Sequence, residues 1–78
     1  MRATLPMTIN NTELNVFFRG KAFDDTIEIY EVIAFLGKER VFRFDGEYQF
    51  GLLAGSIIAD EIFLEVEKSI YEQVQSNH

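Results

Sequence analysis

Residues 26–44, TIEIYEVIAFLGKERVFRF, are the stretch of the chain that decides its fold. Two runs rich in β-branched and aromatic residues, 26–36 and 39–44, flank the pair Gly37-Lys38. A Gly-X pair suits a two-residue hairpin loop, because glycine takes the positive φ that the first loop position requires. The pattern therefore predicts two antiparallel strands joined by a tight turn.

The register of this hairpin predicts which of its side chains are buried. Pairing around a two-residue loop sets Ile33 opposite Phe42, and Phe35 opposite Arg40. Glu31 then falls opposite Phe44. The face expected to form the core carries Ile27, Ile29, Ile33, Phe35, Phe42 and Phe44.

The opposite, outer face of the hairpin is half apolar. We expect it to be an interface, and association with a second copy is the commonest kind, so the chain is predicted to form a homodimer. The alternative is that the N-terminal leader folds across this face. The expected interface residues are Tyr30, Val32, Ala34, Leu36 and Val41.

Alternating apolar and polar residues predict one more strand, over residues 13–19, before the hairpin. Leu14, Val16 and Phe18 share its buried face. Gly20 to Asp25 is a polar segment in which we expect the chain to reverse. Residues 1–8 are expected to be an irregular leader.

After the hairpin, Asp45-Gly46 is the strongest turn dipeptide in the chain. Glu47 to Phe50 reads either as a short fourth strand or as a helix entry with Asp45 as N-cap. We favour an early helical turn, interrupted near the following glycines, with Ser56 capping a longer helix over 56–75. At 100° per residue one side of that helix is apolar. The apolar arc contains Ala59, Ile62, Phe63, Val66, Ile70 and Val74.

The predicted fold is therefore α+β, in one domain spanning 1–78. A three-stranded antiparallel meander (13–19, 26–36, 39–44) is followed by an amphipathic helix (56–75) packed on one sheet face. A chain this short supplies only a few kcal/mol of net stability from its core. Because it contains no cysteine, oligomerisation or dense packing must provide any further support.

Charge is unevenly distributed along the sequence. Residues 1–43 hold six basic and six acidic side chains, so the entire net charge of −6 lies in residues 44–78. A surface of one sign repels phosphate backbones and attracts basic surfaces, which argues against direct nucleic-acid binding. On the predicted helix the acidic face consists of Glu61, Glu65 and Glu72, with Asp60 and Glu67 at its border.

A second apolar line, Ile57, Leu64 and Tyr71 at spacings of seven, lies outside the core arc of the helix. This line is therefore predicted to be exposed. It is bordered by Asp60 and Glu67.

No residue pattern indicates catalysis, so we expect a non-enzymatic protein. The only histidine, His78, is the last residue, and the serines have no neighbouring base that the sequence can place beside them. Carboxylates such as Asp24-Asp25 could hold a divalent ion weakly, but they match no calcium-loop pattern. The aromatic and basic run Arg40 to Phe44 has the parity of a strand with a buried face rather than that of a base-stacking platform. No cofactor is expected.

The acidic helix face is accordingly predicted to dock on a basic surface of a protein partner. Such binding would either block the nucleic-acid-binding site of a defence enzyme or neutralise a toxin, as an immunity protein does. The alternative is a small structural or ligand-binding homodimer in which the charge serves solubility. No apolar run is long enough to span a membrane, and nothing resembles a signal peptide, so a cytoplasmic location is expected.

Overall fold

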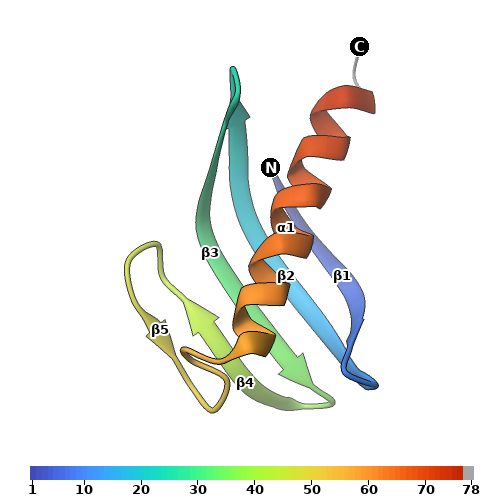
Figure 1. The fold of residues 1–78 in the computed structure, drawn as a ribbon, viewed down its shortest axis with the longest axis vertical. Coiled ribbons are helices and arrows are strands. Elements are labelled where there is room, and N and C mark those ends of the chain that lie inside the picture. The colour runs from blue at the N-terminus through green and yellow to red at the C-terminus, as the bar shows by residue number, and fades with distance from the viewer. Residues whose placement is uncertain (77–78) are drawn as a thin grey trace.

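One antiparallel sheet and one helix make up the fold (Figure 1). The computed structural model describes residues 1–76, with side chains described for 1–74. The five strands lie in the sheet in their chain order, which confirms the α+β class but corrects the predicted number of strands from three to five. The elements are β1 (Arg2–Ile9), β2 (Thr12–Phe23), β3 (Thr26–Leu36), β4 (Glu39–Phe44), β5 (Gln49–Phe50) and α1 (Ile57–Ser76).

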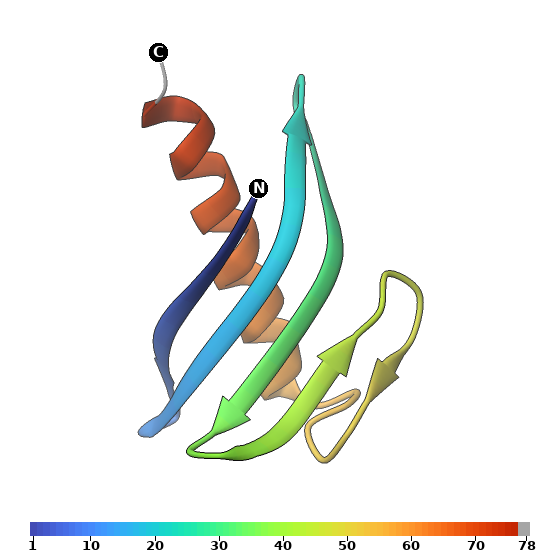
Figure 2. The same cartoon turned by 180° about the vertical axis from the view of Figure 1, so that it is seen from behind.

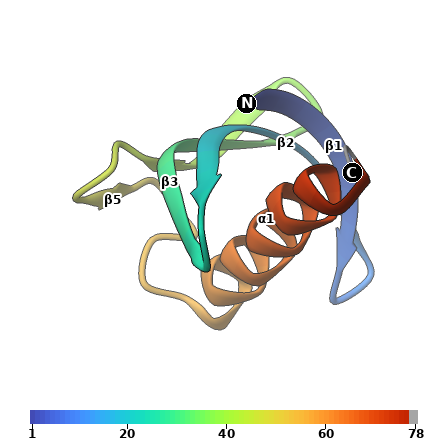
Figure 3. The same cartoon turned by 90° about the horizontal axis from the view of Figure 1, so that it is seen from above.

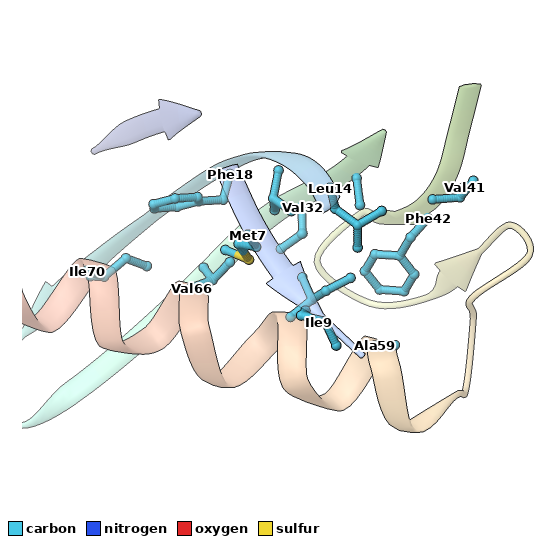
Figure 4. Packing of buried hydrophobic residues seen from close by; sticks show 13 residues of the cluster. Met7, Ile9, Leu14, Phe18, Val32, Val41, Phe42, Ala59, Val66 and Ile70 are labelled. Carbon is cyan, nitrogen blue, oxygen red and sulfur yellow. The ribbon is translucent and has the colours of Figure 1, made fainter. Parts of the chain in front are cut away.

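Helix α1 covers one face of the curved sheet, and no element of the described residues packs on the other face (Figures 2 and 3). The core lies between the helix and the sheet, with side chains from both converging on one layer (Figure 4). Its fully buried large side chains are Val16, Phe18, Val32, Phe42, Ile62, Val66 and Ile70. A two-layer domain of this kind has one buried sheet face and one that meets solvent or a partner.

Serine 56 begins the helix as predicted. Its hydroxyl accepts the backbone N–H of Ala59 at 3.1 Å and donates to the carbonyl of Leu53 at 2.6 Å. The first bond satisfies one of the amide hydrogens that a helix start leaves without an intrahelical partner. The cap therefore joins the helix start to the loop before it.

Phenylalanine 63 fixes the rotation of α1 over β4. Its ring meets Phe42 edge-on at a centroid distance of 5.8 Å and Phe44 at 4.9 Å, both nearly perpendicular. Such edge-to-face pairs add about 0.5–1.5 kcal/mol each beyond the area they bury. With Val66 and Ile70 fully buried, the predicted contact between this helix face and the two phenylalanines of β4 is confirmed.

A β-bulge changes which face of β3 carries its apolar residues. The register passes from Gly20 opposite Ile29 to Arg19 opposite Glu31, so Tyr30 is the extra residue. Before the bulge, Ile27 and Ile29 pack against the core. A bulge shifts the alternation by one residue, so beyond it the even-numbered side chains point to the helix.

A second bulge shifts the alternation of side chains in β4 by one residue. The pairs next to the turn follow the predicted register, with Phe35 opposite Arg40, but Phe42 then falls opposite Ala34 instead of Ile33. Val41 is the extra residue, and its carbonyl accepts the backbone N–H of Leu53 at 3.0 Å. The bulge thus anchors the loop that leads to the helix.

The two bulges overturn several predicted orientations. Val32, Ala34 and Val41 belong to the core, with at most 3% of their surface exposed, so their assignment to the outer face is wrong. Ile33 and Phe35, expected in the core, lie on the outer face and are half-buried there. Phe44 lies opposite Val32 and not opposite Glu31 as predicted, and Glu31 pairs with Arg19 of β2.

The N-terminal residues are also more ordered than predicted. Instead of an irregular leader, Arg2–Ile9 is a strand paired along its whole length with β2. Asn10 and Asn11 form the turn between them, with φ of 50° and 63°. Two consecutive positive φ values are typical of the two-residue turns that match strand twist, and asparagine tolerates them better than most residues.

Strand β2 continues past the predicted break at Gly20 and reaches Phe23, and the chain reverses over Asp24 and Asp25. Gly20 lies inside the strand because no larger residue fits. A Cβ there would lie 2.5 Å from the carbonyl oxygen of Glu28 and 2.7 Å from Cδ1 of Ile70. The glycine therefore allows helix and sheet to approach each other beside the first bulge.

The segment between β4 and α1 follows the alternative that we did not favour. Gln49–Phe50 forms the short strand β5, and residues 51–56 make turns rather than an early helical turn. Asp45 acts in the turn and not as a helix cap, since its Oδ1 accepts the N–H groups of Glu47 and Tyr48. Local turn chemistry and pairing with β4 thus prevail over helix entry.

We expect Gly20→Ala to lower the free energy of unfolding by about 1–3 kcal/mol, because the new methyl group overpacks a backbone contact. Urea denaturation followed by circular dichroism measures the change. Gly37→Asn is the matched control: Gly37 has a φ of +62° and no neighbour within 4 Å of an added Cβ. That variant should stay within about 0.5 kcal/mol of the parent. Equal stability of Gly20→Ala and the parent would show that helix and sheet do not approach this closely.

Candidate partner-binding surface

The outward side of α1 carries a line of exposed apolar side chains. Ile57, Leu64 and Tyr71 have 74%, 64% and 55% of their surface exposed. Seven residues are close to two helical turns, so the three side chains lie above one another over about 21 Å of helix. We call these three residues the outward line. Its predicted exposure is confirmed.

The predicted acidic residues border the outward line on both sides. At 100° per residue, Asp60 and Glu67 fall on the side toward β4, and Glu61, Glu65 and Glu72 on the side toward β1. Glu61 is half-buried and the other four are exposed. The helix thus brings together all five carboxylates of the predicted site around an apolar centre.

Within the described part of the chain, both ion pairs lie on the far side of the sheet. Arg19 Nε is 3.1 Å from Glu31 Oε1, and Arg43 Nε is 4.0 Å from Glu31 Oε2. Lys68 is the one basic side chain of α1. The carboxylates of the helix therefore keep most of their negative charge facing solvent.

In the folded protein, the net negative charge of the last 35 residues also lies apart from most of the basic side chains. The register places five of the seven basic side chains on the outer face of the sheet, opposite the helix. They are Arg2, Arg19, Lys21, Arg40 and Arg43. The acidic surface is thus mainly a property of the helix side of the molecule.

An open cleft of about 530 Å³ runs between α1 and β1. From the helix it is lined by Glu61, Leu64 and Glu65, and from the strand by residues 6–9. Met7 and Ile9 give it an apolar floor. The cleft continues the surface around the outward line toward the edge of the sheet.

The loop before the helix is held by polar groups. The N–H groups of Tyr48 and Glu47, at 2.7 and 2.9 Å from Oδ1 of Asp45, hold the pKa of that carboxyl below its ordinary value. Gln49 Oε1 accepts the N–H of Gly55 at 2.7 Å. These bonds set the approach to the helix, and Leu52 in this loop is 83% exposed.

The remaining sequence candidates are not gathered into a site. Asp24 and Asp25 form the β2–β3 turn, and the described residues contain no group of three or more His, Asp or Glu side chains arranged to hold a metal ion. His78 lies outside the described residues. Of the predicted interface between copies, Tyr30 and Leu36 are exposed while the other three residues belong to the core.

Phe17 belongs to the polar side of the strand predicted over residues 13–19, opposite Leu14, Val16 and Phe18. In the structure Phe17 pairs with Ile33, and both are half-buried on the outer face of the sheet. The signal was an aromatic residue on a face whose other positions are polar. It marks an apolar patch that the predicted interface missed.

No protein-family model, curated protein or solved structure matches the chain. Among the described residues α1 is the one helix. It does not combine the length and apolar character that a membrane-crossing helix needs. Inferences about function therefore come from the surfaces themselves.

We expect the carboxyl of Asp45 to titrate below its ordinary pKa, because its charged form accepts two backbone N–H groups. The order that this carboxylate gives the loop is present above the ordinary pKa and is lost as pH falls through the lowered one. An NMR titration that follows the amide signals of Glu47 and Tyr48 measures the midpoint. In Asp45→Asn these signals should no longer shift with that midpoint. A midpoint at or above the ordinary carboxyl value would contradict the hydrogen bonding.

Proposed function

We propose that this protein is a non-enzymatic binding module whose helix α1 docks on a basic surface of a protein partner. The observation that supports it is the outward line, exposed by 55–74% and bordered on both sides by carboxylates. In a small domain an exposed apolar row is costly in solubility, and such rows commonly mark binding sites.

The two kinds of side chain have different tasks in this proposal. An apolar side chain that becomes fully buried contributes about 1.5–3 kcal/mol, so the outward line can supply affinity. The surrounding carboxylates act at longer range: they steer a basic surface during encounter and discriminate against acidic partners. The fitting partner therefore has an apolar ridge or groove flanked by lysine or arginine.

Symmetric pairing of two copies through this face is unfavourable. Around the outward line the helix has five carboxylates and one lysine. In a symmetric pair the same patch meets itself, so the acidic borders would meet acidic borders. Like charges in such positions oppose association, whereas a basic partner relieves the repulsion.

Proteins that bind nucleic acid carry basic surfaces of this kind, because they neutralise phosphates. We propose that the partner belongs to this class, either an enzyme whose nucleic-acid site the acidic helix covers or a basic toxin that it neutralises. The proposal does not need a cofactor or a metal ion.

A synthetic helical peptide with leucine at heptad positions and lysine at the flanking positions is a suitable probe. We expect the parent protein to bind it in fluorescence anisotropy, with affinity falling as salt rises, since exposed charges are screened over about 8 Å at physiological ionic strength. Leu64→Ser should weaken binding about tenfold or more at unchanged stability, because Leu64 is 64% exposed in the free protein.

Charge reversal on the helix tests the acidic border. The triple variant Glu61→Lys, Glu65→Lys, Glu72→Lys should lose most of the binding and its salt dependence while keeping the circular dichroism of the parent. The matched control, Glu13→Lys, Asp25→Lys, Glu47→Lys, makes the same change in net charge away from α1 and should retain binding. If both triples bind like the parent, the charge serves solubility only. If both lose binding equally, net charge rather than a docking face is responsible.

A further inference from the structure

The outer face of the sheet carries a contiguous apolar patch. Phe17 on β2 lies directly opposite Ile33 on β3, and Phe35 follows two residues along on the same side. All three are half-buried although they lie on the sheet face opposite α1. Ile33 pairs in turn with Arg43 on β4, which pairs with Phe50 on β5. The patch therefore includes apolar side chains of β2, β3 and β5, with Arg43 of β4 between Ile33 and Phe50.

Charged groups of both signs surround this patch, and several are already paired. Glu31 lies between Arg19 and Arg43, at 3.1 and 4.0 Å from their Nε atoms. The guanidinium carbon of Arg43 is also 5.8 Å from the centroid of the Phe50 ring. Arginine and aromatic side chains around an apolar centre are the composition typical of protein interfaces.

From these observations we propose that a second copy of the chain packs on the outer sheet face, giving a symmetric dimer with Phe17, Ile33 and Phe35 at its centre. In a two-fold dimer the patch must complement itself. Interspersed charges meet this condition, because the arginines of one copy can face Glu31 of the other. The outward side of α1, which is almost purely acidic, cannot complement itself in this way.

The edges of the sheet are poor alternatives for joining two copies. Met1 and Gly20 exchange both backbone hydrogen bonds, so along β1 the odd-numbered residues point their N–H groups at β2. The backbone N–H and C=O groups of the even-numbered residues then point to the free edge of the sheet. One of these residues, Pro6, has no N–H to donate. The other edge, β5, is only two residues long. Copies therefore meet face to face rather than edge to edge.

Face-to-face packing produces four layers, with the sheets inside and the two α1 helices outside. The outward line and its carboxylates stay free in such a dimer. The dimer does not rest on the proposed function, because it uses the opposite side of the molecule.

Sedimentation velocity at low to high micromolar concentration tests this arrangement. We expect the parent at twice the 9.0 kDa mass of the chain. Ile33→Glu should be a monomer with the parent's circular dichroism. Leu64→Glu, the same kind of change on the opposite side of the molecule, should remain a dimer. The proposal is wrong if the parent is a monomer at every concentration, or if Leu64→Glu dissociates the dimer and Ile33→Glu does not.

A second pair of variants keeps the test informative if Ile33→Glu unfolds. Because the chain has no cysteine, a single introduced cysteine reports where copies meet. Asn15→Cys, on the outer face beside Phe35, should be joined to its copy by a short bismaleimide, and Glu67→Cys on α1 should not. The reverse result would place the interface on the helix and overturn the proposal.

Single-stranded nucleic acid is the other ligand that suits a face with aromatic and arginine side chains. A labelled oligonucleotide tests whether it binds. We expect no change in its anisotropy with the parent protein. Binding that Arg43→Glu abolishes would show that the face holds nucleic acid, which also overturns the dimer. The lysine-rich peptide should still bind Ile33→Glu, so failure of the dimer can be told apart from failure of the proposed function.

Discussion

Helix α1 has to cover the apolar face of the curved sheet by itself, and the rest of the structure depends on this constraint. The bulges at Tyr30 and Val41 make it possible, because each moves the alternation by one residue and keeps the apolar side chains under α1. Without the first bulge, β3 would turn either Ile27 and Ile29 or Val32 and Ala34 away from the helix. The bulges also increase the local twist, which wraps the sheet around α1 (Figure 3).

The same two positions connect the sheet to the loops. The carbonyl of Val41 takes the N–H of Leu53, and Gly51 passes so close that a Cβ would lie 2.8 Å from that oxygen. A Cβ on Gly46 would in the same way lie 3.1 Å from the carbonyl oxygen of Tyr30. An irregular ladder leaves carbonyls unpaired within the sheet, and the loop before α1 satisfies one of them. The start of the helix, and with it the direction of the outward line, is therefore fixed by the bulge in β4.

Sequence patterns predicted the elements better than their orientation. Strands at 26–36 and 39–44 and the helix at 56–75 agree with the structure, because long periodic segments and a Gly-X turn are strong local signals. The phase of β3 and β4 could not be predicted, since a bulge depends on contacts made by Gly20 and Leu53 from distant parts of the chain. For β1 a signal existed: apolar residues alternate from Ala3 to Ile9 before Asn10-Asn11, a pair suited to a tight turn. On the helix, where no bulge intervenes, the predicted places of the carboxylates and of the outward line agree with the exposed positions.

The chain has a neutral half and an acidic half along its sequence. Folding turns these two halves into two faces of different charge. Residues 1–43, which hold equal numbers of both signs, place most of their basic side chains on one surface, where Glu31 pairs with two arginines. The helix places carboxylates around an apolar line and brings little positive charge to them. A mixed surface can complement itself, and a surface of one sign requires a partner of the other. The two apolar patches are thus suited to different occupants, and the sheet between them allows both to be filled at once.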